Sequence, residues 1–235
     1  PGVLNVITGR GEECGAALAK HPSIRKISMT GSTEVGKTLL HHAADCVLNA
    51  SMELGGKNPQ IICPDADTDY IADGVIAGVR FTRQGQSCTS GSRIYIHKSI
   101  FDSFLKRLVR KVKALKIGDP LDEATDMGAL SSATQFSKAC HYITKAMEEE
   151  GVKLICGGLP PKEGPLAEGY FVEPTIFTCE NHNSILARDE VFGPVIVAIP
   201  WEDEEGVIRL ANDTNYGLAA YVWSKDTARA IRMVQ

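Results

Sequence analysis

The first 54 residues alternate short runs of β-forming residues with amphipathic helical patterns, and this alternation constrains the fold more than any other feature. Short apolar or β-branched runs predict strands, and apolar residues at helical spacing predict helices. Strands that alternate with helices form a parallel sheet with helices on its faces. The expected strands cover residues 3–8, 24–29 and 47–54, and the expected helices cover residues 12–20 and 33–44.

A glycine-rich break, GGKNP at residues 55–59, ends this first pattern. Gly and Pro in such a cluster interrupt helices and strands alike, so we expect a boundary or hinge there. A second α/β pattern follows, with expected strands at 60–63, 93–97, 153–156, 195–199 and 219–223 and expected helices at 67–81, 99–115, 133–150 and 204–212. The sequence therefore predicts two α/β units, residues 1–54 and residues 55–235.

The composition is that of a folded, soluble protein, with 43% hydrophobic residues among 235. The formal net charge is -4 and the basic residues are scattered, which argues against nucleic acid as a partner. No apolar run is long enough to cross a bilayer, so no membrane association is expected. The seven cysteines include no C-x-x-C pair, which favours neither disulfides nor a metal site and indicates a reducing, cytoplasmic setting.

The two ends of the chain suggest a fragment of a longer enzyme. The sequence opens at Pro1 without an initiator methionine. It closes at residues 226–235 on a helical pattern that lacks a Gly or Asn stop signal. We therefore expect the second unit to be incomplete at its carboxyl end.

Cys88 differs from the other six cysteines because its surroundings are small and polar. Residues 84–92 read QGQSCTSGS and lie between an expected helix and an expected strand. The backbone of such a segment can approach a ligand, and its amides can face an oxyanion. Cys88 is therefore a candidate nucleophile, although a Gly/Ser-rich loop with an incidental thiol fits the composition at least as well. The other cysteines lie in or beside apolar segments and are expected to be structural: Cys14, Cys46, Cys63, Cys140, Cys156 and Cys179.

Glu53 lies at the end of an expected strand, immediately before the glycine break. The carboxyl ends of parallel strands are where α/β enzymes place their sites. A partly desolvated carboxylate there could serve as a general base. Taken alone, Glu53 is better explained by a helix-capping or hinge-bonding role.

Two further segments suit a nucleotide. TGSTEVGK, at residues 30–37, falls between a strand and a helix, where the helix amides and the Ser32 hydroxyl suit a phosphate. Plain helix capping by Ser32 or Thr33 explains that segment nearly as well. In DEVFGP, at residues 189–194, Glu190 could bind ribose hydroxyls and Phe192 could lie against a ring, or the segment is only a loop ahead of a strand.

Together these segments, in this order, resemble the aldehyde dehydrogenase superfamily. MELGGKNP at residues 52–59 resembles the glutamate motif of the family, and GQSCTSGSR at residues 85–93 resembles its cysteine motif. Supporting matches at residues 1–7, 30–33, 190–194 and 215–220 extend the resemblance over essentially the whole chain. The resemblance implies the end of a Rossmann-type cofactor domain, residues 1–54, followed by an α/β catalytic domain, residues 55–235.

The resemblance also implies an activity, the oxidation of an aldehyde to a carboxylic acid with NAD or NADP. Cys88 would form a thiohemiacetal and then a thioester, and Glu53 would activate the water that hydrolyses it. The implied cofactor contacts are Gly31 and Ser32 near the pyrophosphate, Leu54 near the nicotinamide, and Glu190 with Phe192 near the nicotinamide ribose and ring. A homodimer or homotetramer is expected on the same ground.

Three other interpretations remain open from the sequence. An acylating dehydrogenase would pass the thioester to coenzyme A, but members of that kind generally lack the glutamate. A truncated, non-catalytic relative would bear the same motifs without turnover. A cysteine hydrolase would pair Cys88 with a histidine, yet none of the six histidines lies in a recognisable partner motif.

Overall fold

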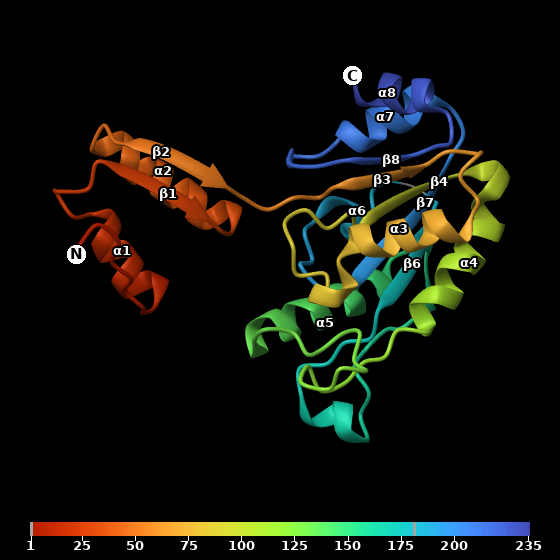
Figure 1. Cartoon of the computed structure of the whole chain (residues 1–235), viewed down its shortest axis with the longest axis horizontal. Coiled ribbons are helices and arrows are strands. Elements are labelled where there is room, and N and C mark those ends of the chain that lie inside the picture. Colours follow the sequence, from red (N-terminus) through yellow and green to blue (C-terminus); the bar gives the residue numbers. More distant parts are fainter. Residues whose placement is uncertain (1, 181) are drawn as a thin grey trace. The chain divides into compact units, whose positions relative to one another are not determined.

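The computed structural model describes residues 2–180 and 182–235, and the chain divides into two compact units, Pro1–Gly55 and Gly56–Gln235. We call them unit 1 and unit 2 (Figure 1). The division falls within the glycine-rich break. Among the described residues, no helix combines the length and the apolar character that crossing a bilayer requires.

Unit 1 is a small α/β unit built on two parallel strands. A π-helical turn, η1 (Gly11–Gly15), leads into α1 (Ala16–Ala19), and β1 (Lys26–Thr30), α2 (Thr33–Asp45) and β2 (Asn49–Glu53) follow. The strands pair in parallel with Thr30 opposite Glu53. Ala19, Ile27 and Ala43 form the small core beneath α2.

The strand expected at residues 3–8 is wrong, because this segment contains neither helix nor strand. Its apolar side chains are exposed: Val3 by 99%, Leu4 by 85%, Val6 by 82% and Ile7 by 65%. A strand forms only when its backbone groups find a neighbouring strand, and none of the described residues supplies one beside this segment. The segment has the apolar pattern of a strand, but the described residues provide no neighbouring strand for its backbone to pair with.

Unit 2 contains a six-stranded sheet in the order β5-β6-β7-β4-β3-β8. Its strands are β3 (Pro59–Ile62), β4 (Arg93–His97), β5 (Val152–Cys156), β6 (Thr175–Cys179), β7 (Val195–Trp201) and β8 (Tyr221–Trp223). All neighbours run parallel except β5, which pairs antiparallel with β6 at one edge. Strand β6 is absent from the sequence-based prediction, although its Thr-Ile-Phe-Thr-Cys run has strand character.

Helices cover both faces of this sheet (Figure 1). They are α3 (Asp69–Val79), α4 (Phe101–Lys113), α5 (Ala133–Glu148), α6 (Ile185–Arg188), α7 (Glu204–Asn212) and α8 (Thr227–Val234), with short 3-10 turns η2 (Phe81–Arg83), η3 (Lys98–Ile100) and η4 (Pro165–Glu168). Consecutive strand residues alternate between the layers. Ile61 belongs to the core shared with α5 to α8, whereas Ile62 belongs to the core shared with α3 and α4. Unit 2 is therefore a three-layer α/β unit.

Arg93, the first residue of β4, is a fully buried cation held by backbone carbonyls. Its Nε donates to the Lys57 carbonyl at 2.7 Å, and its Nη2 donates to the Ala211 carbonyl at 2.8 Å. Its Nη1 donates to the Leu210 carbonyl at 3.2 Å and to the Tyr95 hydroxyl at 3.1 Å. Because Leu210 and Ala211 lie in the last turn of α7, Arg93 caps that helix and ties it to the segment before β3.

We expect Arg93→Met to lower the free energy of unfolding of the intact protein by about 3 kcal/mol, because it leaves buried carbonyls without donors. Urea unfolding followed by circular dichroism measures the loss. Arg110→Met is the control, since the Arg110–Asp69 ion pair is exposed and its removal changes stability little. Equal stability losses in the two variants would contradict this role of Arg93.

Candidate functional site

Four of the predicted site residues lie together in unit 1, at the carboxyl end of β1 and β2. The Gly31 amide donates to the Glu53 carbonyl at 3.0 Å, which extends the pairing of the two strands. Ser32 is the N-cap of α2, and its hydroxyl accepts a hydrogen bond from the Val35 amide at 3.3 Å. The Glu53 side chain is exposed, so unit 1 does not itself supply the desolvation predicted for this carboxylate.

Leu54, the fourth of these residues, packs against the first turns of α2. A Cβ at Gly36 would lie 2.6 Å from Leu54 Cδ2, so the contact requires glycine at that position. Leu54, which follows the candidate base Glu53, is thereby held against α2, the helix that Ser32 caps. The resulting edge of unit 1 presents a helix N-terminus, two small residues and a carboxylate.

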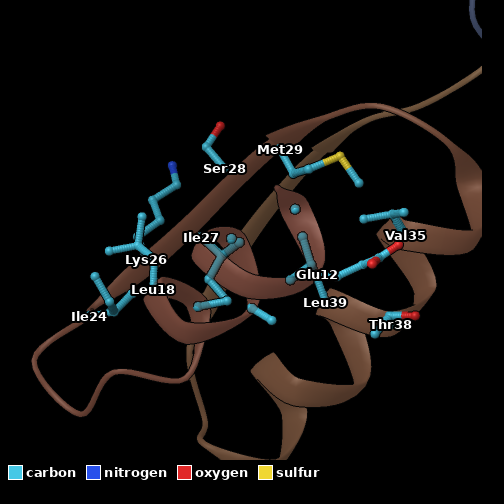
Figure 2. A pocket seen from close by; sticks show the side chains of 14 residues that line it. Glu12, Leu18, Ile24, Lys26, Ile27, Ser28, Met29, Val35, Thr38 and Leu39 are labelled. Carbon is cyan, nitrogen blue, oxygen red and sulfur yellow. The ribbon is translucent and has the colours of Figure 1, made fainter. Parts of the chain in front are cut away.

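An apolar groove of about 680 Å³ lies beside this edge, and sequence reasoning did not find it. Figure 2 shows side chains from β1, including Ile27 and Met29, and from α2, including Val35 and Leu39, around it. The remaining lining comes from η1, α1 and the turn before β1. An apolar groove beside a helix N-terminus suits a molecule that carries a flat ring and a phosphate.

The predicted site residues of unit 2 gather at the amino-terminal edge of its sheet, because each lies on a segment that enters a strand. Residues 56–58 lead into β3, residues 88–92 lead into β4, and residues 190–194 lead into β7. Glu53 therefore lies at the carboxyl end of a strand, where α/β enzymes commonly place their sites, whereas Cys88 lies at the amino-terminal edge. Because β3, β4 and β7 run parallel, their three entry segments lie at the same edge of the sheet.

Close backbone contacts join the three segments. The Gly56 amide donates to Glu190 Oε1 at 2.9 Å, and a Cβ at Gly56 would lie 2.4 Å from the Cys88 carbonyl oxygen. Gly85, which has a φ of +66°, is so close to the Gly193 carbonyl that a Cβ there would lie 2.2 Å from it. Unit 2 thus brings Cys88, Glu190 and Phe192 into one neighbourhood.

The thiol of Cys88 is half-buried, at the end of a turn-rich segment. Within residues 2–180 and 182–235, the backbone amides of Cys88 and Thr89 donate to no acceptor. Unpaired amides next to a nucleophile can bind an oxyanion. No histidine in this part of the chain hydrogen-bonds to Cys88. The buried His182 instead bonds to the Tyr95 hydroxyl.

Phe192 adopts a left-handed backbone conformation, with φ of 56°, which costs a non-glycine residue on the order of 1 kcal/mol. Gln135 in α5 stabilises it, because its Nε2 donates to the Phe192 carbonyl at 2.7 Å and to the Val191 carbonyl at 3.0 Å. Sequence reasoning missed Gln135. Its position three residues after the N-cap Ser132 indicates a capping box, but the side chain reaches another segment instead.

Lys57 is a buried lysine beside these residues, only 2% exposed. Burial lowers the pKa of Lys57 to about 7, the neighbouring Arg93 cation acts in the same direction, and Glu190 opposes them. The ammonium is therefore only partly charged at neutral pH.

Among the other six thiols, burial raises the pKa of three, and a fourth is exposed. Burial raises the pKa of Cys63 to about 11 and also raises the pKa of Cys140 and Cys156, which makes these thiols poor nucleophiles. Cys46 is exposed, so its expected place in apolar packing is wrong. It follows the last turn of α2, where that helix meets solvent.

In the described part of the chain, no group of three or more His, Cys, Asp or Glu residues could hold a metal ion.

Comparison with known families identifies the chain. The family whose sequence model matches it is the aldehyde dehydrogenase family, and the match covers residues 1–235. The chain belongs to the aldehyde dehydrogenase family. The predicted resemblance is thereby confirmed, and the α/β fold class with it, because solved aldehyde dehydrogenases superpose closely on the chain.

Curated aldehyde dehydrogenases align with nearly all of this chain. A betaine aldehyde dehydrogenase of Brucella anthropi is 43% identical over 233 residues, which cover 99% of this chain and 47% of the relative. The aldehyde dehydrogenase tropH of Talaromyces stipitatus is 44% identical over 239 residues, which cover 100% of this chain and 46% of the relative. The chain therefore spans about half the length of the curated relatives that it matches.

Solved structures agree with this assignment. Betaine aldehyde dehydrogenase from Staphylococcus aureus in complex with NAD+ matches with a TM-score of 0.92 and 39% identity, over 97% of this chain and 45% of that one. HpcC from Thermus thermophilus matches with a TM-score of 0.93 and 41% identity, over 99% of this chain and 45% of that one.

Proposed function

We propose that the protein oxidises an aldehyde to a carboxylic acid with NAD or NADP, through a covalent intermediate on Cys88. The observation that carries the proposal is the half-buried Cys88 on a segment whose amides are unpaired, in a chain that matches the aldehyde dehydrogenase family throughout. A thiolate adds to a carbonyl carbon and creates an oxyanion, which the Cys88 amide can bind.

Glu53 is the proposed general base for the second half of the reaction. It accepts a proton from the water that attacks the thioester, and the acid then leaves Cys88. Only Leu54 and Gly55 separate Glu53 from Gly56, the residue that contacts the Cys88 carbonyl. A short connection therefore joins the proposed base to the segment beside the nucleophile. Residues 1–54 would be the end of the cofactor domain and residues 55–235 the catalytic domain.

The residues of unit 1 fit a dinucleotide. The apolar groove offers a surface for an adenine ring, and Gly31 with the Ser32-capped start of α2 offers amides to a pyrophosphate. Leu54, fixed against Gly36, offers an apolar surface to the nicotinamide. When bound, the nicotinamide supplies the hydride acceptor.

In unit 2, Glu190 and Phe192 are the proposed contacts of the nicotinamide ribose and ring. The Gly56 amide occupies Glu190 Oε1 and orients the carboxylate, which leaves Oε2 for ribose hydroxyls. The bond from Gln135 to the Phe192 carbonyl holds the aromatic residue in its strained conformation. No disulfide joins two cysteines within the described residues, which fits a reducing compartment such as the cytoplasm. A homodimer or homotetramer remains a prediction from the family.

A cofactor-reduction assay of the intact protein tests the function. A panel of aldehydes, beginning with betaine aldehyde because of the named relatives, is supplied with NAD or NADP, and the product is identified by mass spectrometry. We expect the reduced cofactor and the carboxylic acid in equal amounts, with no requirement for coenzyme A. A coenzyme A thioester as the product would favour the acylating reaction, and a complete lack of cofactor reduction would favour a non-catalytic relative.

A further inference from the structure

Every carbonyl of residues 88–92, which we call the nucleophile segment, accepts a hydrogen bond from another part of unit 2. The donors are Asn58 Nδ2 to Cys88 at 2.7 Å and to Ser90 at 2.9 Å, the Tyr221 hydroxyl to Thr89 at 2.8 Å, Gln60 Nε2 to Gly91 at 2.9 Å, and the Val197 amide to Ser92 at 3.0 Å. Three of the four donor residues use side chains. The segment is thus held from outside, through its carbonyls.

Asn58 holds two of the five carbonyls with one amide group. Its Nδ2 donates to the carbonyls of Cys88 and Ser90, and its Oδ1 accepts from the Ala219 amide at 2.8 Å. These partners fix the orientation of the amide, since carbonyls need a donor and a backbone amide needs an acceptor. The side chain is 2% exposed, so each of these bonds is protected from water.

This arrangement decides which polar groups of the nucleophile segment remain free. With the Cys88 and Thr89 carbonyls bonded to Asn58 and Tyr221, the amides of Cys88 and Thr89 are among the backbone groups of this segment that have no partner in the described residues. Amides near a sulfur stabilise its thiolate, whereas carbonyls destabilise it. Because these bonds hold the carbonyls in place, the unpaired amides of Cys88 and Thr89 remain available to stabilise negative charge at the nucleophile.

We propose that Asn58 is a positioning residue for the Cys88 nucleophile, and this inference rests on the function proposed above. Asn58 touches neither the sulfur nor a reacting atom in the described contacts, and it acts through the Cys88 and Ser90 carbonyls. Its replacement frees both carbonyls to turn toward the sulfur. The nucleophile then loses its fixed direction and faces carbonyl acceptors where it had unpaired amide donors.

The first test measures alkylation by iodoacetamide at pH 7.5 in the intact protein, with labelled peptides identified by mass spectrometry. Cys46 in unit 1 is exposed and serves as an internal reference in each sample. We expect Asn58→Ala and Asn58→Asp to slow labelling of Cys88 about tenfold relative to Cys46. Asn58→Asp keeps the shape but removes the donors, whereas Asn58→Ala removes the whole amide without adding charge.

Trp201→Phe is the matched control. The Trp201 indole donates to the Ile62 carbonyl at 3.2 Å, so this variant also removes one side-chain donor to a backbone carbonyl, but at the opposite end of β3. Labelling of Cys88 in Trp201→Phe should match that of the parent protein even if its melting temperature falls. If the folded Asn58 variants label at the parent rate, or Trp201→Phe slows labelling as much as they do, Asn58 does not position Cys88.

The second test uses turnover. Because positioning acts on the chemical step, we expect a roughly 10- to 100-fold lower kcat for the Asn58 variants with a nearly unchanged KM for the aldehyde. A parent-like kcat in these variants would overturn the proposal. Failure of the proposed function would be seen separately, as aldehyde oxidation that persists in Cys88→Ser, because the alkylation result does not depend on turnover.

Discussion

Cys88→Ser is expected to lower kcat for aldehyde oxidation by roughly 10⁴-fold or more, because the covalent intermediate cannot form without the thiolate. A serine hydroxyl has nearly the same size, but it is almost never ionised at neutral pH. Binding of NAD or NADP should remain, since the proposed groove lies in unit 1 and is lined by other residues. Loss of kcat with retained cofactor binding would distinguish a lost nucleophile from a misfolded protein.

Initial rates of cofactor reduction and fluorescence titration with the reduced cofactor measure these two properties. Cys46→Ser is the matched control, because it changes a more exposed thiol in the same way and should keep the parent kcat. A Cys88→Ser protein that kept most of its activity would remove Cys88 from the mechanism. The chain would then need another nucleophile, and burial argues against Cys63, Cys140 and Cys156.

The sequence predicts the fold class well because most of its signals are local. The alternation of strand and helix patterns requires only periodicity, and the structure contains β1, α2 and β2 close to the predicted ranges. Residues 3–8 show the limit of this reasoning, since a strand also requires a neighbour that the pattern does not contain. Strand β6 was missed for the converse reason, because five residues carry a weak signal and its place between β5 and β7 stabilises it.

The candidate site is predictable where it has a local motif. Cys88 and Glu53 are candidates because each lies in a motif whose residue order resembles one of the family, whereas small neighbouring residues alone would not single them out. Asn58 and Gln135 were not assigned roles, because their side chains bond to carbonyls 30 or more positions away along the chain. No periodicity encodes such bonds. That the entry segments of β3, β4 and β7 lie next to one another likewise follows from strand order, which becomes visible only in three dimensions.

Glu53→Gln is expected to separate the two halves of the reaction. Gln keeps the size of the side chain but cannot take a proton, so hydrolysis of the thioester should slow while its formation continues. Stopped-flow absorbance should then show a rapid burst close to one reduced cofactor per active site. A steady-state rate about 10²- to 10⁴-fold below the parent should follow.

Two further measurements make this prediction specific to deacylation. Acid quenching followed by peptide mass spectrometry should find the acyl group on Cys88, and hydroxylamine should raise the steady-state rate because a strong nucleophile needs no general base. Glu13→Gln, an exposed carboxylate in η1 that does not line the apolar groove, is the matched control and should behave like the parent. If the burst itself slows in Glu53→Gln, the carboxylate acts before the thioester forms. Deprotonation of Cys88 would then be its main task, and a different group would have to activate the water.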